Sequence, residues 1–243
     1  MTTPTTLRKH SKRYRQAATL VDRARSYSPE EAVALVKQLA SAAFDETVEL
    51  HLRTGSDPRR ADQLIRGVVI LPHGTGKPIR VLVFAQGEAA QAAREAGADF
   101  IGDDEVVRRI EEGWTDFDTS IATPDMMGRI GRLGRILGRR GLMPNPRTGT
   151  VVPAQDIPRA VQEAKRGRVE FRMDRTAIIH VPVGKASFEP KQLLENIAAV
   201  VDAVQKARPQ GVRGQYLRSA YLSTTMGPSV KLDVNALTGL RAE

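Results

Sequence analysis

The chain has 243 residues, 41% of them hydrophobic and 5% aromatic, a length that allows one large or two modest domains. It contains no cysteine, which excludes disulfides, thiol catalysis and cysteine-ligated zinc. Lysine and arginine number 37 against 28 acidic residues, so the net charge of +9 favours an anionic partner, nucleic acid before membrane. No apolar run approaches the ~18 residues of a spanning helix, and we expect no membrane partner.

A basic arm opens the chain, with no acid before Asp22 and no apolar core of a secretory signal, so we expect a cytoplasmic protein. Ser28-Pro29-Glu30-Glu31 is typical of a helix start, and apolar residues at helical spacing extend the predicted helix over 29–41. Residues 44–53 alternate between apolar and polar side chains, which predicts a half-buried strand, and a second strand is predicted over 66–72.

The pattern changes at the glycine-containing loop 73–78. Beyond this loop, strands and helices alternate with short connections, which predicts a three-layer α/β unit with a mainly parallel sheet. The predicted strands are 79–84, 100–101, 119–122 and 151–152, and the predicted helices are 88–96, 104–112, a stretch from Asp125, and 154–166.

After residue 166 the chain returns to the character of its first part. Strands are predicted at 169–173, 177–183, 215–223 and 230–234, with a helix over 190–206. The expected fold class is therefore α/β, with two domains joined by a double hinge. A discontinuous α+β outer domain, 1–73 with 167–243, carries an inserted three-layer α/β, Rossmann-like domain, 74–166. We expect Gly74 and Gly167 to be the hinge residues at the two crossings.

The segment Ser223-Thr224-Thr225-Met226-Gly227-Pro228 separates the last two predicted strands. Gly227 can take a positive φ and Pro228 fixes its own φ, so the backbone is bent and held here. Such a turn presents hydroxyl groups and one soft apolar side chain together. It is either a hairpin that only joins strands or a rigid contact surface for a polar partner.

A run of arginines and glycines follows Met126 and contains no acidic residue before Gly149. The guanidinium group suits phosphate oxygens, and glycine allows a ribose-phosphate chain to approach the backbone. A solvated basic face is the alternative. The candidate phosphate contacts are Arg129, Arg132, Arg135, Arg139, Arg140 and Arg147.

Patterns of catalysis or cofactor binding are weak. Gly128, Gly131 and Gly134 lack the spacing of a dinucleotide loop, and no Ser or Thr follows Lys77 as in a phosphate loop. The four histidines (His10, His51, His73 and His180) share no metal-ligand spacing. We therefore expect no metal, no cofactor and no enzymatic activity. A structural role is the default for His180, although it could face a phosphate.

Several motifs, in order along residues 8–235, resemble the bacterial ribosomal protein L-one family. They are Phe44-Asp45-Glu46-Thr47-Val48-Glu49, Asp57-Pro58-Arg59-Arg60, Arg66-Gly67, Leu71-Pro72-His73-Gly74, Gly97-Ala98-Asp99, Ala122-Thr123-Pro124-Asp125-Met126-Met127, Leu133-Gly134-Arg135-Ile136-Leu137-Gly138, Gly141-Leu142-Met143-Pro144-Asn145-Pro146, Pro182-Val183-Gly184-Lys185-Ala186-Ser187-Phe188 and Thr224-Thr225-Met226-Gly227-Pro228-Ser229.

This resemblance implies a non-enzymatic constituent of the large ribosomal subunit that binds folded 23S-type ribosomal RNA in the mobile stalk, near the exit site for deacylated tRNA. It further implies exit-site tRNA as a partner, repression of the protein's own messenger RNA, and a monomer when free. The RNA-binding residues it implies are Phe44, Thr47, Glu49, His180, Gly184, Lys185, Ser219, Thr224, Thr225, Met226 and Gly227.

Two positions depart from the family pattern: Arg139 stands where proline is usual, and the segment 128–134 is one residue shorter. The tail 235–243 lies beyond the resemblance, and we expect it to be disordered. Two other functions stay open from the residues alone. One is a nucleotide-binding enzyme built on the insert, and the other is a messenger regulator with no ribosomal role.

Overall fold

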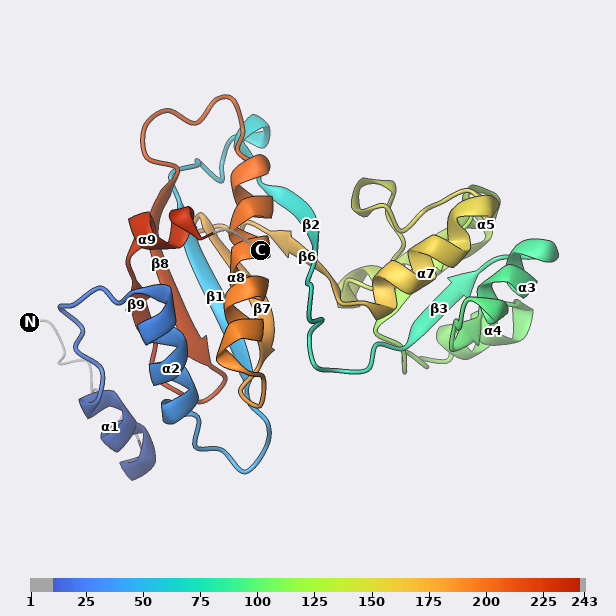
Figure 1. Ribbon diagram of the computed structural model, residues 1–243. Helices are drawn as coiled ribbons and strands as arrows, with labels where there is room; N and C mark the ends of the chain where they lie inside the picture. The colour runs from blue at the N-terminus through green and yellow to red at the C-terminus, as the bar shows by residue number, and fades with distance from the viewer. Residues whose placement is uncertain (1–10, 241–243) are drawn as a thin grey trace, which may run out of the picture. The chain divides into compact units, whose positions relative to one another are not determined.

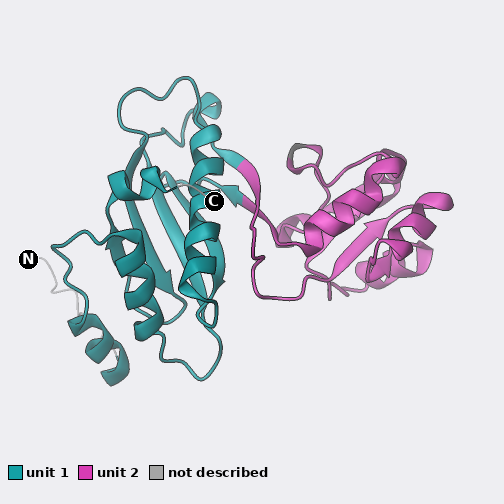
Figure 2. Ribbon diagram, viewed as in Figure 1, with its two compact units in different colours: residues 1–66, 171–243 teal, residues 67–170 magenta. Residues whose placement is uncertain are grey.

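The computed structural model describes residues 11–240, apart from the side chain of Arg147. The chain divides into two compact units (Figure 2): unit 1 contains the outer segments up to residue 66 and from residue 171 on, and unit 2 contains residues 67–170. The boundaries expected at 73/74 and 166/167 both fall inside unit 2. The reason is that β2 (Arg66–Ile70) pairs with β6 (Arg168–Arg172), and most of this two-stranded ribbon belongs to unit 2.

Unit 1 is built on a four-stranded antiparallel sheet in the order β7-β1-β8-β9. Its strands are β1 (Thr47–Thr54), β7 (Ile178–Lys185), β8 (Leu217–Thr224) and β9 (Val230–Leu232). The central strand β1 buries Val48, Leu50 and Leu52 and leaves the intervening side chains more exposed, as the alternation in its sequence predicts.

Two helices, α2 (Pro29–Leu39) and α8 (Pro190–Lys206), cover one face of this sheet (Figure 1). The predicted start of α2 is confirmed: the Ser28 hydroxyl accepts from the Glu31 N–H, and the Glu31 carboxylate accepts from the Ser28 N–H. The buried side of α8 is almost entirely aliphatic, and its one buried amide, Asn196, donates to the Val183 carbonyl at 2.7 Å. Because α2 and α8 lie on the same face, the opposite face of the sheet is not covered by a helix of the described residues.

Unit 2 contains a parallel sheet in the order β4-β3-β5, formed by β4 (Phe100–Ile101), β3 (Val81–Phe84) and β5 (Thr119–Ala122). Strand β3 is buried on both sides. Its two valines pack with α3 (Glu88–Glu95) and α7 (Ile157–Lys165). Leu82 and Phe84 pack with α4 (Asp104–Glu111), α5 (Pro124–Ile130) and α6 (Gly134–Leu137). The predicted α/β class with a three-layer insert is thus confirmed.

Shorter elements complete the chain. Helix α1 (Lys12–Thr19) buries no residue, and α9 (Val234–Gly239) packs against α8 and β8. The 3₁₀ turns of the described residues are η1 (Ala61–Gln63), η2 (Gly131–Leu133), η3 (Gly138–Arg140), η4 (Pro146–Thr148) and η5 (Ala154–Asp156). No helix in the described chain has both the length and the apolar character needed to cross a membrane.

The basic arm contains α1, capped by the Ser11 hydroxyl. Two local expectations were wrong. The tail 235–243 was expected to be disordered, but residues 235–239 belong to α9, because Asp233 accepts from the N–H groups of Asn235 and Ala236 and Leu237 is buried. Residues 241–243 lie outside the described residues. Residues 151–152 form only an isolated bridge, from Val151 to Ala122.

Gly74 and Gly167 lie against each other inside unit 2. Both have positive φ, 67° and 100°, and a Cβ on Gly167 would lie 2.4 Å from the Cα of Gly74. The Leu71 N–H also donates to the Gly167 carbonyl at 3.1 Å. Close approach of two backbones, as well as positive φ, therefore requires glycine here. The hinge role of these residues stays a prediction.

Candidate nucleic-acid interface

The uncovered face of the unit 1 sheet, here called the open face, is polar. Because successive side chains point to opposite sides, the residues between the buried ones share this face across all four strands. They are Thr47, Glu49, His51 and Arg53 on β1, His180, Pro182 and Lys185 on β7, Ser219, Tyr221 and Ser223 on β8, and Lys231 on β9.

A histidine pair lies in the middle of the open face. His51 and His180 are opposite each other in the β1–β7 register, and their Nδ1 atoms are 2.8 Å apart. At this distance one Nδ1 carries a proton and donates a hydrogen bond to the other Nδ1. Nε2 of His51 lies 3.0 Å from the Ser223 hydroxyl, and Nε2 of His180 lies 3.6 Å from the Asp174 carboxylate. If both histidines were protonated, the Nδ1–H group of His51 would point at the Nδ1–H group of His180.

The pKa of His51 lies below its ordinary value of 6.5, first because burial disfavours the imidazolium and second because His180 is close; Glu49 opposes this shift. In the unfolded chain His51 therefore takes up its proton at higher pH than in the folded protein. The free energy of unfolding should fall as the pH drops below about 6.5, with a slope of at most ~1.4 kcal/mol per pH unit for one proton.

Urea unfolding between pH 7.5 and pH 5, followed by circular dichroism, measures this dependence. We expect His51→Gln to have a shallower pH dependence than the wild-type protein. Equal slopes for the wild-type protein and His51→Gln would contradict the prediction.

At the end of the open face, the turn after β8 is tied to the start of β1. The Thr225 hydroxyl accepts from the Thr47 N–H at 3.1 Å, and the Thr225 N–H donates to the Thr47 carbonyl at 3.1 Å. Lys185 Nζ donates to the Thr47 hydroxyl at 2.9 Å. Three residues predicted to bind RNA, from three segments of the chain, thus meet at one point.

Two large apolar side chains are exposed on the segments next to this point. Phe44, in the loop 40–46 before β1, is 55% exposed, and Met226, in the turn after β8, is 52% exposed. Exposed apolar side chains at the edge of a polar surface are suited to pack against sugars or unstacked bases.

The structure corrects the expected presentation of the turn. Thr224 is only 3% exposed, so the turn presents one of its two threonine hydroxyls to solvent. Gly227 does not have positive φ; glycine is needed because a Cβ there would lie 2.4 Å from the Thr224 hydroxyl oxygen. Gly184 is also buried, and its φ of 152° and its approach to Phe188 and Leu193 account for glycine at that position.

The arginine–glycine segment of unit 2 folds as α5, η2, α6 and η3. Cβ atoms added to Gly128, Gly131, Gly134 and Gly138 would meet nothing within 4 Å, so these glycines leave the surface open. The segment is less cationic than its sequence suggests, because two of its arginines form ion pairs with acids of α4. These pairs are Arg129–Asp104 and Arg132–Glu111, the latter at 2.9 Å.

The remaining candidate arginines differ in their surroundings. Arg140 donates to the Thr115 hydroxyl, whereas exposed Arg135 and Arg139 form no ion pair with the described residues. The side chain of Arg147 lies outside the described part of the chain. Within residues 11–240, no group of three or more histidine, aspartate or glutamate residues could hold a metal ion.

The profile of the Ribosomal protein L1p/L10e family matches residues 36–228. The chain belongs to this family. It is similar to "Large ribosomal subunit protein uL1" of Chloroflexus aurantiacus, with 59% identity over 96% of this chain and 99% of the relative. The proteins of the same name in Dehalococcoides mccartyi (56% identity; 95% and 98% covered) and Thermobifida fusca (56%; 94% and 96% covered) are also similar.

Membership of the L1p/L10e family confirms the resemblance seen in the motifs and the assignment to ribosomal proteins rather than enzymes. The structure brings most of the site residues implied by the family together in unit 1. Phe44, Thr47, Lys185, Thr225 and Met226 lie at one end of the open face, and Glu49, His180 and Ser219 lie across it. The arginine–glycine segment belongs to unit 2.

Sequence reasoning missed two residues of the candidate site. His51 was treated as one polar position of a strand, although the strand register makes it the partner of His180. Glu46 was not singled out, although it has the same parity as buried Val48, Leu50 and Leu52. A carboxylate at a core-facing position of a strand is the signal that could have found it.

Proposed function

We propose that this chain, a structural constituent of the large ribosomal subunit in the cytoplasm, binds a folded region of 23S-type ribosomal RNA through the open face. The observation that carries the proposal is the uncovered polar face of the sheet. At one end of this face, hydrogen bonds join Thr47 to Thr225 and to Lys185. The neighbouring segments expose Phe44 and Met226. Folded RNA is recognised by shape, by 2′-hydroxyl groups and by unstacked bases, and this surface offers hydroxyl, imidazole and apolar groups for all three.

Cations on the open face add an electrostatic contribution from Arg53, Lys185 and Lys231. Because binding to phosphates releases counterions, the affinity for a stalk-region ribosomal RNA fragment should fall by tenfold or more between about 50 and 200 mM salt. Filter binding with the native fragment and with a scrambled fragment of equal length measures this fall. We expect strong preference for the native fragment at every salt concentration. Equal affinity for both fragments would refute specific recognition.

We further propose that unit 2 contacts exit-site tRNA through its arginine–glycine segment and so assists release of the deacylated tRNA. The open glycine positions support this proposal, as do the exposed guanidinium groups of Arg135 and Arg139, which form no ion pair with the described residues. A movement of unit 2 about the two crossings near Gly74 and Gly167 would let the bound tRNA leave with it.

Replacing both Arg135 and Arg139 by glutamine should weaken tRNA binding to ribosomes that contain the variant by about tenfold, since two phosphate contacts are lost. The charge-matched control replaces Arg94 and Arg159, on α3 and α7 of unit 2, by glutamine. Retention of deacylated tRNA at the exit site is the measurement. A control variant as weak as the first would mean that net charge, rather than this segment, governs binding.

A messenger RNA with a fold similar to the ribosomal site would compete for the same open face, and we propose that the protein represses its own messenger in this way. Competition between labelled ribosomal fragment and the protein's own messenger leader tests this role. Failure of the leader to displace the fragment would exclude it.

A further inference from the structure

Glu46, the last residue of the loop 40–46, contacts both this loop and the turn after β8. Its side chain is 1% exposed, although it is a carboxylate. Oε1 accepts from the N–H groups of Ser41, at 2.9 Å, and Ala42, at 2.8 Å. Oε2 accepts from the Met226 N–H at 2.9 Å. One side chain therefore joins two segments that are 180 positions apart in the sequence.

The two segments joined by Glu46 are those that expose Phe44 and Met226. Neither side chain is held by a hydrophobic core, since each is more than half exposed. Their positions depend on the backbone beneath them. The bonds of Thr225 and Gly227 hold the turn closed, but the Met226 N–H itself is bonded to Glu46.

Glu46 remains ionised in this buried place. Burial raises the pKa of its carboxyl group, but hydrogen bonds from Met226, Ala42 and Ser41 outweigh burial and hold the pKa below 4.5. Hydrogen bonds from three N–H donors to one charged acceptor are strong, and removing the acceptor would leave these part-buried donors without this partner.

We propose that Glu46 is the positioning residue of the RNA site, whose buried carboxylate fixes Phe44 and Met226 in one geometry before RNA binds. Preorganisation of this kind raises affinity because the free protein has already lost the conformational entropy that binding would otherwise cost. The inference rests on the proposed RNA-binding function. It does not require Glu46 to touch RNA.

Glu46→Gln is the appropriate variant, because it keeps the volume and replaces one acceptor oxygen by an NH₂ group. The amide oxygen can serve either the Ser41–Ala42 side or Met226, while the NH₂ group faces a backbone N–H on the other side. The substitution also removes a negative charge, so electrostatics alone would make RNA binding tighter. Positioning makes it weaker, and the sign of the change separates the two effects.

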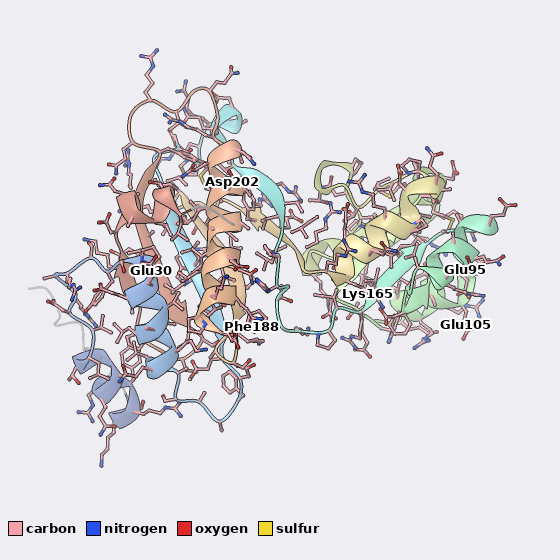
Figure 3. The ribbon with its side chains drawn as sticks, in the orientation of Figure 1. Glu30, Glu95, Glu105, Lys165, Phe188 and Asp202 are labelled. Atoms are coloured by element: carbon pink, nitrogen blue, oxygen red, sulfur yellow. The ribbon has the colours of Figure 1, made fainter. Side chains whose placement is uncertain are left out.

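We expect Glu46→Gln to bind the stalk-region fragment at least tenfold more weakly at constant pH and salt, with an unchanged salt dependence. Asp202→Asn is the charge-matched control; Asp202 lies on α8, which covers the other face of the sheet (Figure 3). This control should bind at least as tightly as the wild-type protein. Wild-type or tighter binding by Glu46→Gln would overturn the inference.

A double-mutant cycle distinguishes positioning from a general loss of stability. Because Glu46 acts partly through Met226, Glu46→Gln should cost less affinity in a Met226→Ala background than in the wild-type background, and the remaining loss reflects Phe44. Fully additive losses would overturn the inference, because a role independent of Met226 predicts them.

Amide hydrogen exchange in the free protein gives a readout that needs no RNA. We expect Glu46→Gln to speed exchange of the Met226 N–H, whereas the Gly227 N–H, bonded to the Thr224 carbonyl, stays protected. Unchanged protection of Met226 would refute the positioning role. A different result would separate the two proposals. If the wild-type protein did not prefer the native RNA but the Met226 N–H still lost protection in Glu46→Gln, the RNA-binding function would be refuted. The role of Glu46 in joining the loop 40–46 to the turn after β8 would still be supported.

Discussion

Replacing Thr225 by valine should lower the affinity for the native ribosomal RNA fragment by tenfold to a hundredfold, equivalent to ~1.4–2.8 kcal/mol. Valine keeps the shape of threonine but lacks the hydroxyl that accepts from the Thr47 N–H. That N–H would lose its partner beside the RNA site, and any bond from the hydroxyl to RNA would be lost as well. The bond from the Thr225 N–H to the Thr47 carbonyl remains, so the turn should stay folded.

The measurement is binding to the native and scrambled fragments at one moderate salt concentration. Thr238→Val is the matched control, because Thr238 is an exposed threonine of α9 whose hydroxyl donates to the Asn235 carbonyl. We expect the control to bind like the wild-type protein. Preference that survives Thr225→Val would keep the ribosomal function and assign recognition to Phe44, Met226 and Lys185.

Gly167→Ala should destabilise unit 2 by about 3 kcal/mol or more, since it combines an unfavourable φ with a steric clash. The φ of 100° disfavours any residue with a Cβ, and this Cβ would lie 2.4 Å from the Cα of Gly74. Because the obstacle is backbone, no side-chain rotation can relieve the clash. Relief would require the two crossing segments to separate.

Gly113→Ala isolates the two effects. Gly113 has a φ of 105°, but a Cβ there would meet nothing within 4 Å. It should therefore cost only the conformational part, about 1–2 kcal/mol. Trp114, the single tryptophan of the chain, lies in unit 2 and reports urea unfolding of that unit by fluorescence. Equal midpoints for the two variants would show that the contact between the crossings contributes nothing.

Local features of the fold were predictable because local chemistry determines them. The alternation in β1 follows from the side-chain period of a strand, and Ser28-Pro29-Glu31 contains the groups that cap α2. The apolar run of β3 predicted a strand buried on both faces. The family motifs then predicted which polar positions belong to the proposed RNA site.

Features that depend on distant pairing were not predictable from the sequence. The His51–His180 contact depends on the register of strands 129 positions apart, and no local pattern contains that register. The run of arginines along the chain exaggerated the cationic character of the arginine–glycine segment, because Arg129 pairs with Asp104 on another helix.

The position of β1 in the middle of its sheet has a consequence for synthesis on the ribosome. Both neighbours of β1 are translated late, since Thr47 pairs with Lys185 and Val48 with Thr224. Unit 2 is a continuous segment and is complete by residue 170. Because domains fold as their chain becomes available, unit 2 should fold first. Strand β1 remains unpaired until β7 and β8 have been synthesised. The surface proposed to bind RNA is therefore the last part of the molecule to form, and a nascent chain must be synthesised through β9 before this surface is complete.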